Sequence, residues 1–280
     1  MNAVRPRLLL FDLDETLLGP TRRVSPANAE ALRAAMAQGI RVGFATGRSK
    51  QSVQPWIEEL EPNAPLILLN GGMVWDVTSE TALSEHRLPA ADARATLAIL
   101  DELGVHANVY LGDKIVIARR SETSRQSEIK DGVPHRVVPD LTTHVEAQPV
   151  PPLKILCIRE SNGIEELAER LRPALTAGSV LVRSEPTYLE VLPPGVSKGA
   201  ALSVVLKHCG IPASEVFSFG DGLNDLELLA ASGLGVAMGN AHPQVQESAD
   251  CIIGPNDSDS ISDFLRLRAG LVSVSPSERG

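Results

Sequence analysis

Short apolar runs recur along the chain, and each is followed by a turn rich in glycine, asparagine or aspartate. The runs with their turns cover 8–19, 40–48, 65–72, 216–225 and 233–241. A helical pattern separates the first two, with Ser25 as its cap, Pro26 in its first turn and Gly39 as its stop. Apolar runs that alternate with helices predict a parallel sheet covered on both faces. Ligands of such sheets bind at the carboxyl ends of the strands, where these turns lie.

A different pattern fills the interval 83–192, where strand-like runs come in pairs around short turns. The pattern predicts hairpins over 105–118 and 179–192, helices over 90–103 and 163–172, and a strand in "LKILCIR". Residues 121–152 are polar, contain prolines and carry little pattern. The sequence therefore predicts a core domain formed by 1–82 and 193–270, an inserted antiparallel α+β domain over 83–192, and a loose tail at 271–280.

Composition narrows the class of protein. The chain has 280 residues, 43% hydrophobic and 22% charged, which is typical of an ordinary globular protein. A net charge of −9 and an aromatic content of 3% argue against nucleic-acid binding. No apolar stretch approaches the roughly 20 residues that cross a bilayer, and the apolar run Leu8–Phe11 is too short for a signal peptide. We expect a cytoplasmic protein without a membrane partner, and nothing indicates its oligomeric state.

Other residue types give no sign of a site. The three cysteines, Cys157, Cys209 and Cys251, are far apart and form no disulfide or metal-ligand spacing. We interpret them as small buried hydrophobic residues. The histidines are scattered without ligand spacing, and none is assigned a role.

Two aspartates, Asp12 and Asp14, directly follow the first apolar run. Residues two apart on a strand project to the same side, roughly 6.5–7 Å apart. At a strand end the pair can face one ligand. The alternative is a solvated loop that happens to contain two acids, and this fragment alone does not decide between them.

Three later turns favour a ligand. "GDGLND" contains Asp221 and Asp225, although an acid such as Asp225 is also ordinary at a helix start. If the sheet brings the acidic turns together, the clustered carboxylates require a hard cation, and Mg²⁺ suits them. The turn 46–48, Thr-Gly-Arg, offers a hydroxyl and backbone N–H groups to phosphate oxygens. Lys198, in "VSKGAAL", supplies an ammonium group, unless it is only a surface charge.

Taken in order, "DLDET", "ATGR", the lysine of "SKG" and "GDGLND" resemble the four motifs of haloacid-dehalogenase-superfamily phosphatases. The insertion after "LNGG" resembles the type IIB (C2B) cap of the Cof-like subfamily. The resemblance implies an α/β fold with a Rossmann-like parallel-sheet core and an inserted α+β cap domain. Glu15 departs from the usual glycine or aspartate, at a position that varies in the family.

The resemblance also implies a role for each matching residue. Asp12 would be the nucleophile that becomes an aspartyl-phosphate, and Asp14 the general acid and base. Mg²⁺ would be held by Asp12, the backbone carbonyl of Asp14, and Asp221, with Asp225 as an indirect or occasional direct contact. The groups implied to hold the phosphoryl group are the backbone N–H of Leu13, Thr46, Gly47, Lys198 and Asn224.

The resulting hypothesis is a Mg²⁺-dependent phosphatase that hydrolyses a small phosphorylated metabolite, such as a sugar phosphate. A phosphomutase or phosphotransferase of the same family is the first alternative, and a receiver-like phosphoacceptor module is a second. The proton donor expected at Asp14 argues against a receiver, and its presence also disfavours a hydrolytic dehalogenase. The sequence identifies neither the substrate nor the cap residues that select it.

Two further segments lie near the predicted strand ends. Asn70-Gly71-Gly72 closes the third run, where the need for a turn is a sufficient reason for these residues. Glu190 lies where the chain returns from the insertion to the core, and we expect either a substrate contact or a hinge role.

Overall fold

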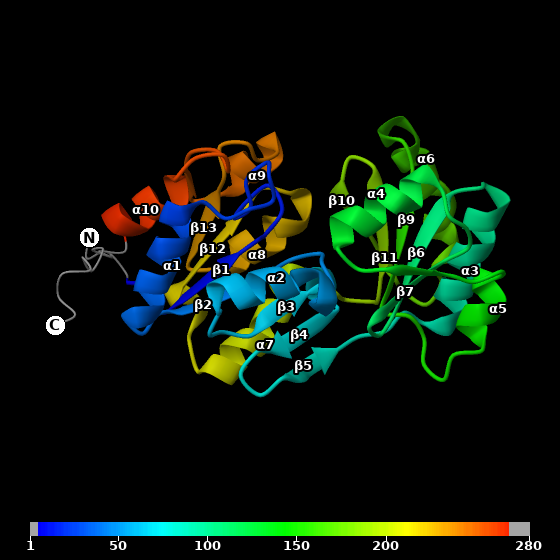
Figure 1. Cartoon of the computed structure of the whole chain (residues 1–280), viewed down its shortest axis with the longest axis horizontal. Coiled ribbons are helices and arrows are strands. Elements are labelled where there is room, and N and C mark those ends of the chain that lie inside the picture. The colour runs from blue at the N-terminus through cyan, green and yellow to red at the C-terminus, as the bar shows by residue number, and fades with distance from the viewer. Residues whose placement is uncertain (1–4, 269–280) are drawn as a thin grey trace. The chain divides into compact units, whose positions relative to one another are not determined.

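The chain forms two compact units in a computed structural model that describes residues 5–268 (Figure 1). The first unit contains the described residues up to Thr46, Pro55–Leu83 and the residues from Ser197 onward. The second contains Gly47–Gln54 and Ser84–Val196. The short segment at the start of this second unit was not predicted to group with the insertion. The predicted tail at 271–280 lies outside the described residues.

A five-stranded sheet forms the centre of the first unit, in the order β14-β13-β12-β1-β2, and every neighbouring pair in it is parallel. Its strands are β1 (Leu8–Phe11), β2 (Arg41–Phe44), β12 (Val216–Gly220), β13 (Leu234–Ala237) and β14 (Cys251–Ile252). All four residues of β1 are buried because the strand is central and both faces of the sheet are covered. The predicted α/β core is therefore confirmed.

Helices cover both faces of this sheet. On one face Leu8 and Leu10 pack in a cluster with residues of α7 and α8. On the other, Phe219 stacks on Phe11 and meets Phe264 of α10 edge to face. The helices of this unit are α1 (Pro26–Ala37), α7 (Lys198–Cys209), α8 (Leu226–Ala231), α9 (Pro243–Ser248) and α10 (Ser260–Arg268), and α2 (Lys50–Leu60) begins in the second unit and ends in the first.

The third predicted run differs from the expectation of a full strand in the parallel sheet. It forms a single isolated parallel bridge, between Ile67 and Ala45, the residue that follows β2. It then pairs antiparallel with the next segment and forms a separate sheet. The strands of this sheet are β3 (Leu66–Leu68), β4 (Met73–Asp76) and β5 (Thr81–Glu85). The strands β4 and β5 were not predicted from the sequence.

The second unit contains a six-stranded sheet in the order β10-β11-β9-β6-β7-β8. Its strands are β6 (His106–Leu111), β7 (Lys114–Ile117), β8 (His135–Val137), β9 (Lys154–Ile158), β10 (Val180–Glu185) and β11 (Tyr188–Leu192). The two predicted hairpins are the antiparallel pairs β6–β7 and β10–β11. All other pairs in this sheet are antiparallel except β7–β8, which is parallel.

The two faces of this second sheet differ in chemistry. Ala107 and Val109 face an apolar core with residues of α3 (Ala90–Glu102) and α6 (Ile164–Leu171). The alternate residues Asn108 and Tyr110 instead face α4. The amide of Asn108 donates a hydrogen bond to Ser127, and the hydroxyl of Tyr110 donates one to Asp131. The interval 121–152, which carried little sequence pattern, contains α4 (Glu122–Asp131), β8 and α5 (Leu141–Glu146). Within the described part of the chain, no helix has the length and apolar content to cross a membrane.

Candidate active site

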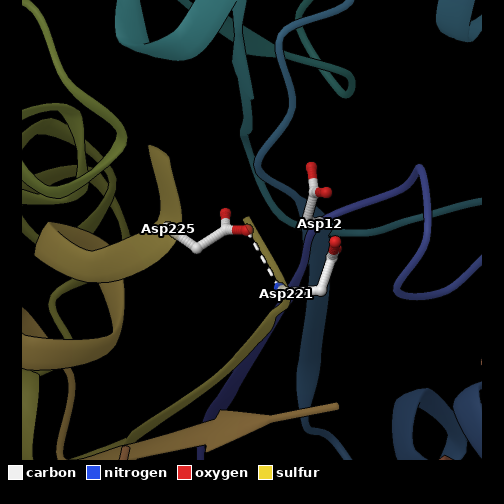
Figure 2. Close-up of side chains that lie close together, drawn as sticks. All are labelled: Asp12, Asp221 and Asp225. Carbon is white, nitrogen blue, oxygen red and sulfur yellow. Dashed lines mark hydrogen bonds between the residues drawn. The ribbon is translucent and has the colours of Figure 1, made fainter. Parts of the chain in front are cut away.

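Three parallel strands end side by side, and this register brings together the predicted acids. Phe11 at the end of β1 lies opposite Phe219 of β12 on one side and Phe44 of β2 on the other. The N–H of Asp12 continues the ladder by donating to the carbonyl of Phe219, at 2.9 Å. One carboxylate oxygen from each of Asp12, Asp221 and Asp225 lies within 4.8 Å of the others (Figure 2).

Lys198 is buried between two of these acids. Its Nζ lies 2.8 Å from Oδ1 of Asp12 and 2.6 Å from Oδ1 of Asp225. The side chain of Lys198 is 0% exposed, so the alternative of a surface charge is wrong. Lys198 is the first residue of α7, where Ser197 caps the helix by accepting the N–H of Ala200 at 3.0 Å.

Asp225 is fixed by its own turn. Its Oδ2 accepts the backbone N–H groups of Asp221 and Gly222, at 3.1 and 3.0 Å; Figure 2 draws the first of these bonds. The turn is tight enough that a Cβ at position 220 would lie 2.6 Å from the Cβ of Asp225. Glycine is therefore required at position 220, and Asp225 is held by two backbone donors and one ammonium group.

Asp221 is oriented by a residue that the sequence analysis did not single out. Thr16 is fully buried, and its Oγ1 donates to Oδ1 of Asp221 at 2.6 Å. The available signal was the position of Thr16 two residues after Asp14 in "DLDET", which continues the alternation that begins at Asp12.

The cluster holds three carboxylates and one ammonium group, and its pKa values reflect this imbalance. Burial and the nearby carboxylates raise the pKa of Asp12 well above its ordinary value, against the opposing effect of Lys198. Burial and Asp225 raise the pKa of Asp221 to about 7. Burial would lower the pKa of Lys198, but Asp12 and Asp225 outweigh it and raise that pKa. The lysine therefore stays charged, the site disfavours full ionisation of all three acids, and a bound cation would favour their charged forms.

The other predicted site residues are placed as follows. Thr46 is buried two residues after the end of β2, and its carbonyl accepts the N–H of Asn70 at 2.9 Å. Asn224 donates through Nδ2 to Oδ1 of Asn70, also at 2.9 Å. From the sequence, Asn70 was explained by the need for a turn alone. Leu13 is fully buried in the loop after β1.

Asp14 and Gly47 are the two remaining predicted site residues. Among the described residues, the group of acids that could hold a metal contains Asp12, Asp221 and Asp225 and not the side chain of Asp14. The expected metal contact of Asp14 is through its backbone carbonyl and stays a prediction. Gly47 falls in the second unit, where its carbonyl accepts a hydrogen bond from Lys154 at 2.8 Å.

Glu190 forms a buried ion pair within the second unit. Its Oε2 lies 2.8 Å from Nζ of Lys154, and both side chains are 3% exposed. The Nζ of Lys154 also lies 4.6 Å from the ring centre of Tyr110. The contact with substrate and the hinge role both stay predictions for Glu190.

Comparison with known proteins assigns the chain to a family. The sequence profile of the haloacid dehalogenase-like hydrolases matches residues 9–265. The pyridoxal phosphate phosphatase YbhA of Escherichia coli (strain K12) is 29% identical over 266 residues, covering 92% of this chain and 97% of that protein. The HMP-PP phosphatase of Serratia proteamaculans (strain 568) is 30% identical over 279 residues, covering 96% and 98%.

A solved structure agrees with the sequence relatives. A haloacid dehalogenase-like hydrolase from Bacteroides thetaiotaomicron matches with a TM-score of 0.85 and 29% identity, covering 94% of this chain and 99% of that one. The family and the α/β class with an inserted α+β domain, both predicted from the motifs, are confirmed. The chain belongs to the haloacid dehalogenase-like hydrolase family.

Proposed function

We propose that the protein is a Mg²⁺-dependent phosphatase that hydrolyses a small phosphorylated metabolite through an aspartyl-phosphate at Asp12. One observation carries this proposal: a fully buried lysine binds Asp12 and Asp225, while Asp221 adds a third carboxylate within 4.8 Å. Placing two buried acids and one half-buried acid around a single base is unfavourable for stability alone. The arrangement is explained if a cation and a phosphoryl group bind there.

The donor set of the cluster fits a magnesium ion. The acids offer only oxygen ligands, which hard cations prefer, and Mg²⁺ is often held by one or two carboxylates together with water and substrate phosphate. Asp12, Asp221 and the carbonyl of Asp14 are the proposed ligands. Asp225 already accepts three hydrogen bonds, so we propose that it acts mainly by holding Lys198 and the turn. When bound, Mg²⁺ would neutralise negative charge on the carboxylates and on the phosphoryl oxygens.

In the proposed reaction, a carboxylate oxygen of Asp12 attacks phosphorus and the bond from phosphorus to the leaving oxygen breaks. Asp14 donates its proton to that leaving oxygen, and the alcohol departs. Asp14 then accepts a proton from a water molecule whose oxygen attacks the same phosphorus. The bond from phosphorus to Asp12 breaks, inorganic phosphate leaves, and both aspartates return to their starting state.

The phosphoryl oxygens need fixed donors during this transfer. An ammonium group has three N–H donors, and Lys198 uses two of them on Asp12 and Asp225. We propose that the third binds a phosphoryl oxygen. The hydroxyl of Thr46, the amide of Asn224 and the backbone N–H groups of Leu13 and Gly47 are the other proposed donors.

The class of substrate follows from the relatives. Their names specify pyridoxal phosphate and HMP-PP, both small phosphorylated molecules. We propose a substrate of the same class, and a cytoplasmic location stays a prediction.

The proposal is tested with the purified full chain and p-nitrophenyl phosphate. We expect hydrolysis with Mg²⁺, its loss with EDTA, and a decrease of at least about 10³-fold for Asp12→Asn, because the amide oxygen is a poor nucleophile. Asp101→Asn is a matched control, since Asp101 is exposed on α3. Undiminished turnover in Asp12→Asn would remove the nucleophile assignment.

The same assay addresses the alternatives. With sugar phosphates as substrates, release of free phosphate supports the phosphatase, whereas an isomerised sugar phosphate without free phosphate indicates a phosphomutase. A stable phosphorylated protein without turnover indicates a phosphoacceptor module.

A further inference from the structure

The turn that follows β3 has an unusual backbone. Leu69, Asn70 and Gly71 are consecutive residues with positive φ, at 54°, 55° and 98°. Glycine and asparagine tolerate this region, but a leucine there is strained. Leu69 and Asn70 are both 1% exposed, so the strained turn is also buried. Strain of this kind persists only where the surrounding structure imposes it, and it is common at functional sites.

Asn70 connects two of the proposed phosphoryl-binding segments. Its backbone N–H donates to the carbonyl of Thr46 at 2.9 Å. Its side-chain Oδ1 accepts Nδ2 of Asn224, also at 2.9 Å. Asn70, in its left-handed conformation, thus makes one contact through its backbone and the other through its carboxamide.

Gly71 connects the same turn to the third segment. A Cβ on Gly71 would lie 2.2 Å from the carbonyl oxygen of Ser197, the residue before Lys198. The backbone of the turn therefore packs directly against the start of α7. The three residues 69–71 thus touch the segments that contain Thr46, Asn224 and Lys198.

The side chain of Asn70 is poorly explained by stability alone. Within the described part of the chain, its Nδ2 is buried and has no hydrogen-bond partner. Burying an unpaired donor is unfavourable, so a turn chosen only for its shape would be better served by glycine at this position. The carboxamide is instead explained by its contact with Asn224.

We propose that Asn70 is a positioning residue for the phosphoryl site, and that it acts by orienting Asn224. Its Oδ1 holds one N–H of the Asn224 amide and leaves the second N–H to donate to a phosphoryl oxygen. The proposal rests on the function proposed above. It adds a residue outside the four motifs to the groups that set the geometry of phosphoryl transfer.

The variant Asn70→Gly tests the proposal, because glycine adopts the left-handed backbone and keeps the N–H to Thr46 while removing the carboxamide. We expect kcat/KM for p-nitrophenyl phosphate with Mg²⁺ to fall about 10- to 100-fold, with an unchanged melting temperature. The inhibition constant of inorganic phosphate should rise as well, which a purely structural role would not cause. Glu80→Gly is the matched control: Glu80 is exposed, has φ of 53°, and its replacement should leave all three values unchanged.

A double-mutant cycle tests the route through Asn224. In an Asn224→Ala background, Asn70→Gly should have little further effect on kcat/KM, since the group that it positions is gone. Equal losses in both backgrounds, or no loss in Asn70→Gly, would overturn the proposal. If the glycine variant is unstable, Asn70→Ser, with a side chain one bond shorter, repeats the cycle. A wild-type protein without Mg²⁺-dependent hydrolysis would instead overturn the proposed function, so the two failures are distinguishable.

Discussion

Each of the two units contains a buried lysine, and the two lysines have different surroundings. Lys198 in the first unit is bound by Asp12 and Asp225, with Asp221 close by. Lys154 in the second unit is bound by one carboxylate, that of Glu190, and by the carbonyl of Gly47. The charges balance around Lys154, whereas the acids exceed the base around Lys198.

This difference distinguishes a self-sufficient ion pair from the cluster that we propose as the active site. A balanced, hydrogen-bonded pair needs no further group and can be replaced by apolar side chains with little loss of stability. An unbalanced cluster is stable only when something else compensates its charge. Both are buried cation–carboxylate contacts, so the imbalance of charge, and not burial, is what supports the first cluster as the proposed active site.

The largest effect is expected when the lysine of the unbalanced cluster is removed. Lys198→Met should lower kcat for p-nitrophenyl phosphate about 10³-fold, because a fixed charge facing the phosphoryl group is lost. It should also lower the free energy of unfolding by roughly 3–5 kcal/mol, because Asp12 and Asp225 remain buried without their partner. Steady-state kinetics and urea unfolding measure the two effects.

Lys207→Met is the control for this change, since Lys207 is an exposed lysine on the same helix. It should leave both the rate and the stability nearly unchanged. A Lys198→Met variant with wild-type kcat would show that the ammonium group has no part in phosphoryl transfer.

A change of stability is the main effect expected in the balanced pair. Lys154→Met should lower the free energy of unfolding by about 3–5 kcal/mol, because Glu190 is left charged and buried. The double variant Lys154→Met/Glu190→Leu should recover most of that loss, since it removes both charges.

Arg94→Met is the control, because it breaks an exposed ion pair with Glu146, and it should lower the free energy of unfolding by less than about 1 kcal/mol. A double variant as unstable as the single one would contradict the view of a self-sufficient pair.

The smallest effect on stability is expected at Asp92, a buried acid of the second unit that is held by backbone N–H groups. The two carboxylate oxygens of Asp92 accept the N–H groups of Ala177 and Ser179, at 3.0 and 3.1 Å. Burial would raise the pKa of Asp92, but hydrogen bonds from this loop outweigh it and hold the pKa below the ordinary value of 3.8. The folded state therefore favours the charged form of Asp92.

Asp92→Asn should reduce stability by about 1–2 kcal/mol at pH 7, because an amide NH₂ cannot accept the second bond. The charged form is stabilised by folding, so its contribution is complete above the ordinary pKa and is lost as pH falls through the lower folded pKa. Urea unfolding from pH 7 to pH 3 should show the difference between wild type and variant narrowing at the acidic end. A difference in unfolding free energy that widens toward pH 3 would contradict the prediction.

The parallel core and its acids could be predicted because their signals are local and repeated. Leu8–Phe11 is apolar at every position, as a strand buried on both faces must be, and Asp12 follows at once. Lys198 follows the helix cap Ser197, and Asp221 and Asp225 lie in the turn after β12, so each position is marked by a cap or a turn that follows a strand. Spacing alone places these residues near strand ends, whereas their expected roles came only from the resemblance to the four family motifs.

The missed elements carry weaker or misleading signals. Helix α4 has no apolar stripe, and its start is marked only by Ser121 and Ser124, whose side chains form a capping box. The pair Asn70-Gly71 is a known hairpin signal and could have predicted the antiparallel partner of β3. The positive φ of Leu69 could not be predicted, because leucine avoids that region and only the packed surroundings impose it.

The pairing of β1 with β12 has a consequence for how the protein is made. Leu8 lies opposite Val216, so the first strand of the sheet finds this neighbour only after more than two hundred further residues have left the ribosome. Contacts so distant in sequence form late. We expect a nascent chain to carry Asp12, the proposed nucleophile, in an incomplete site through most of translation, and a truncated product to be inert toward phosphate esters.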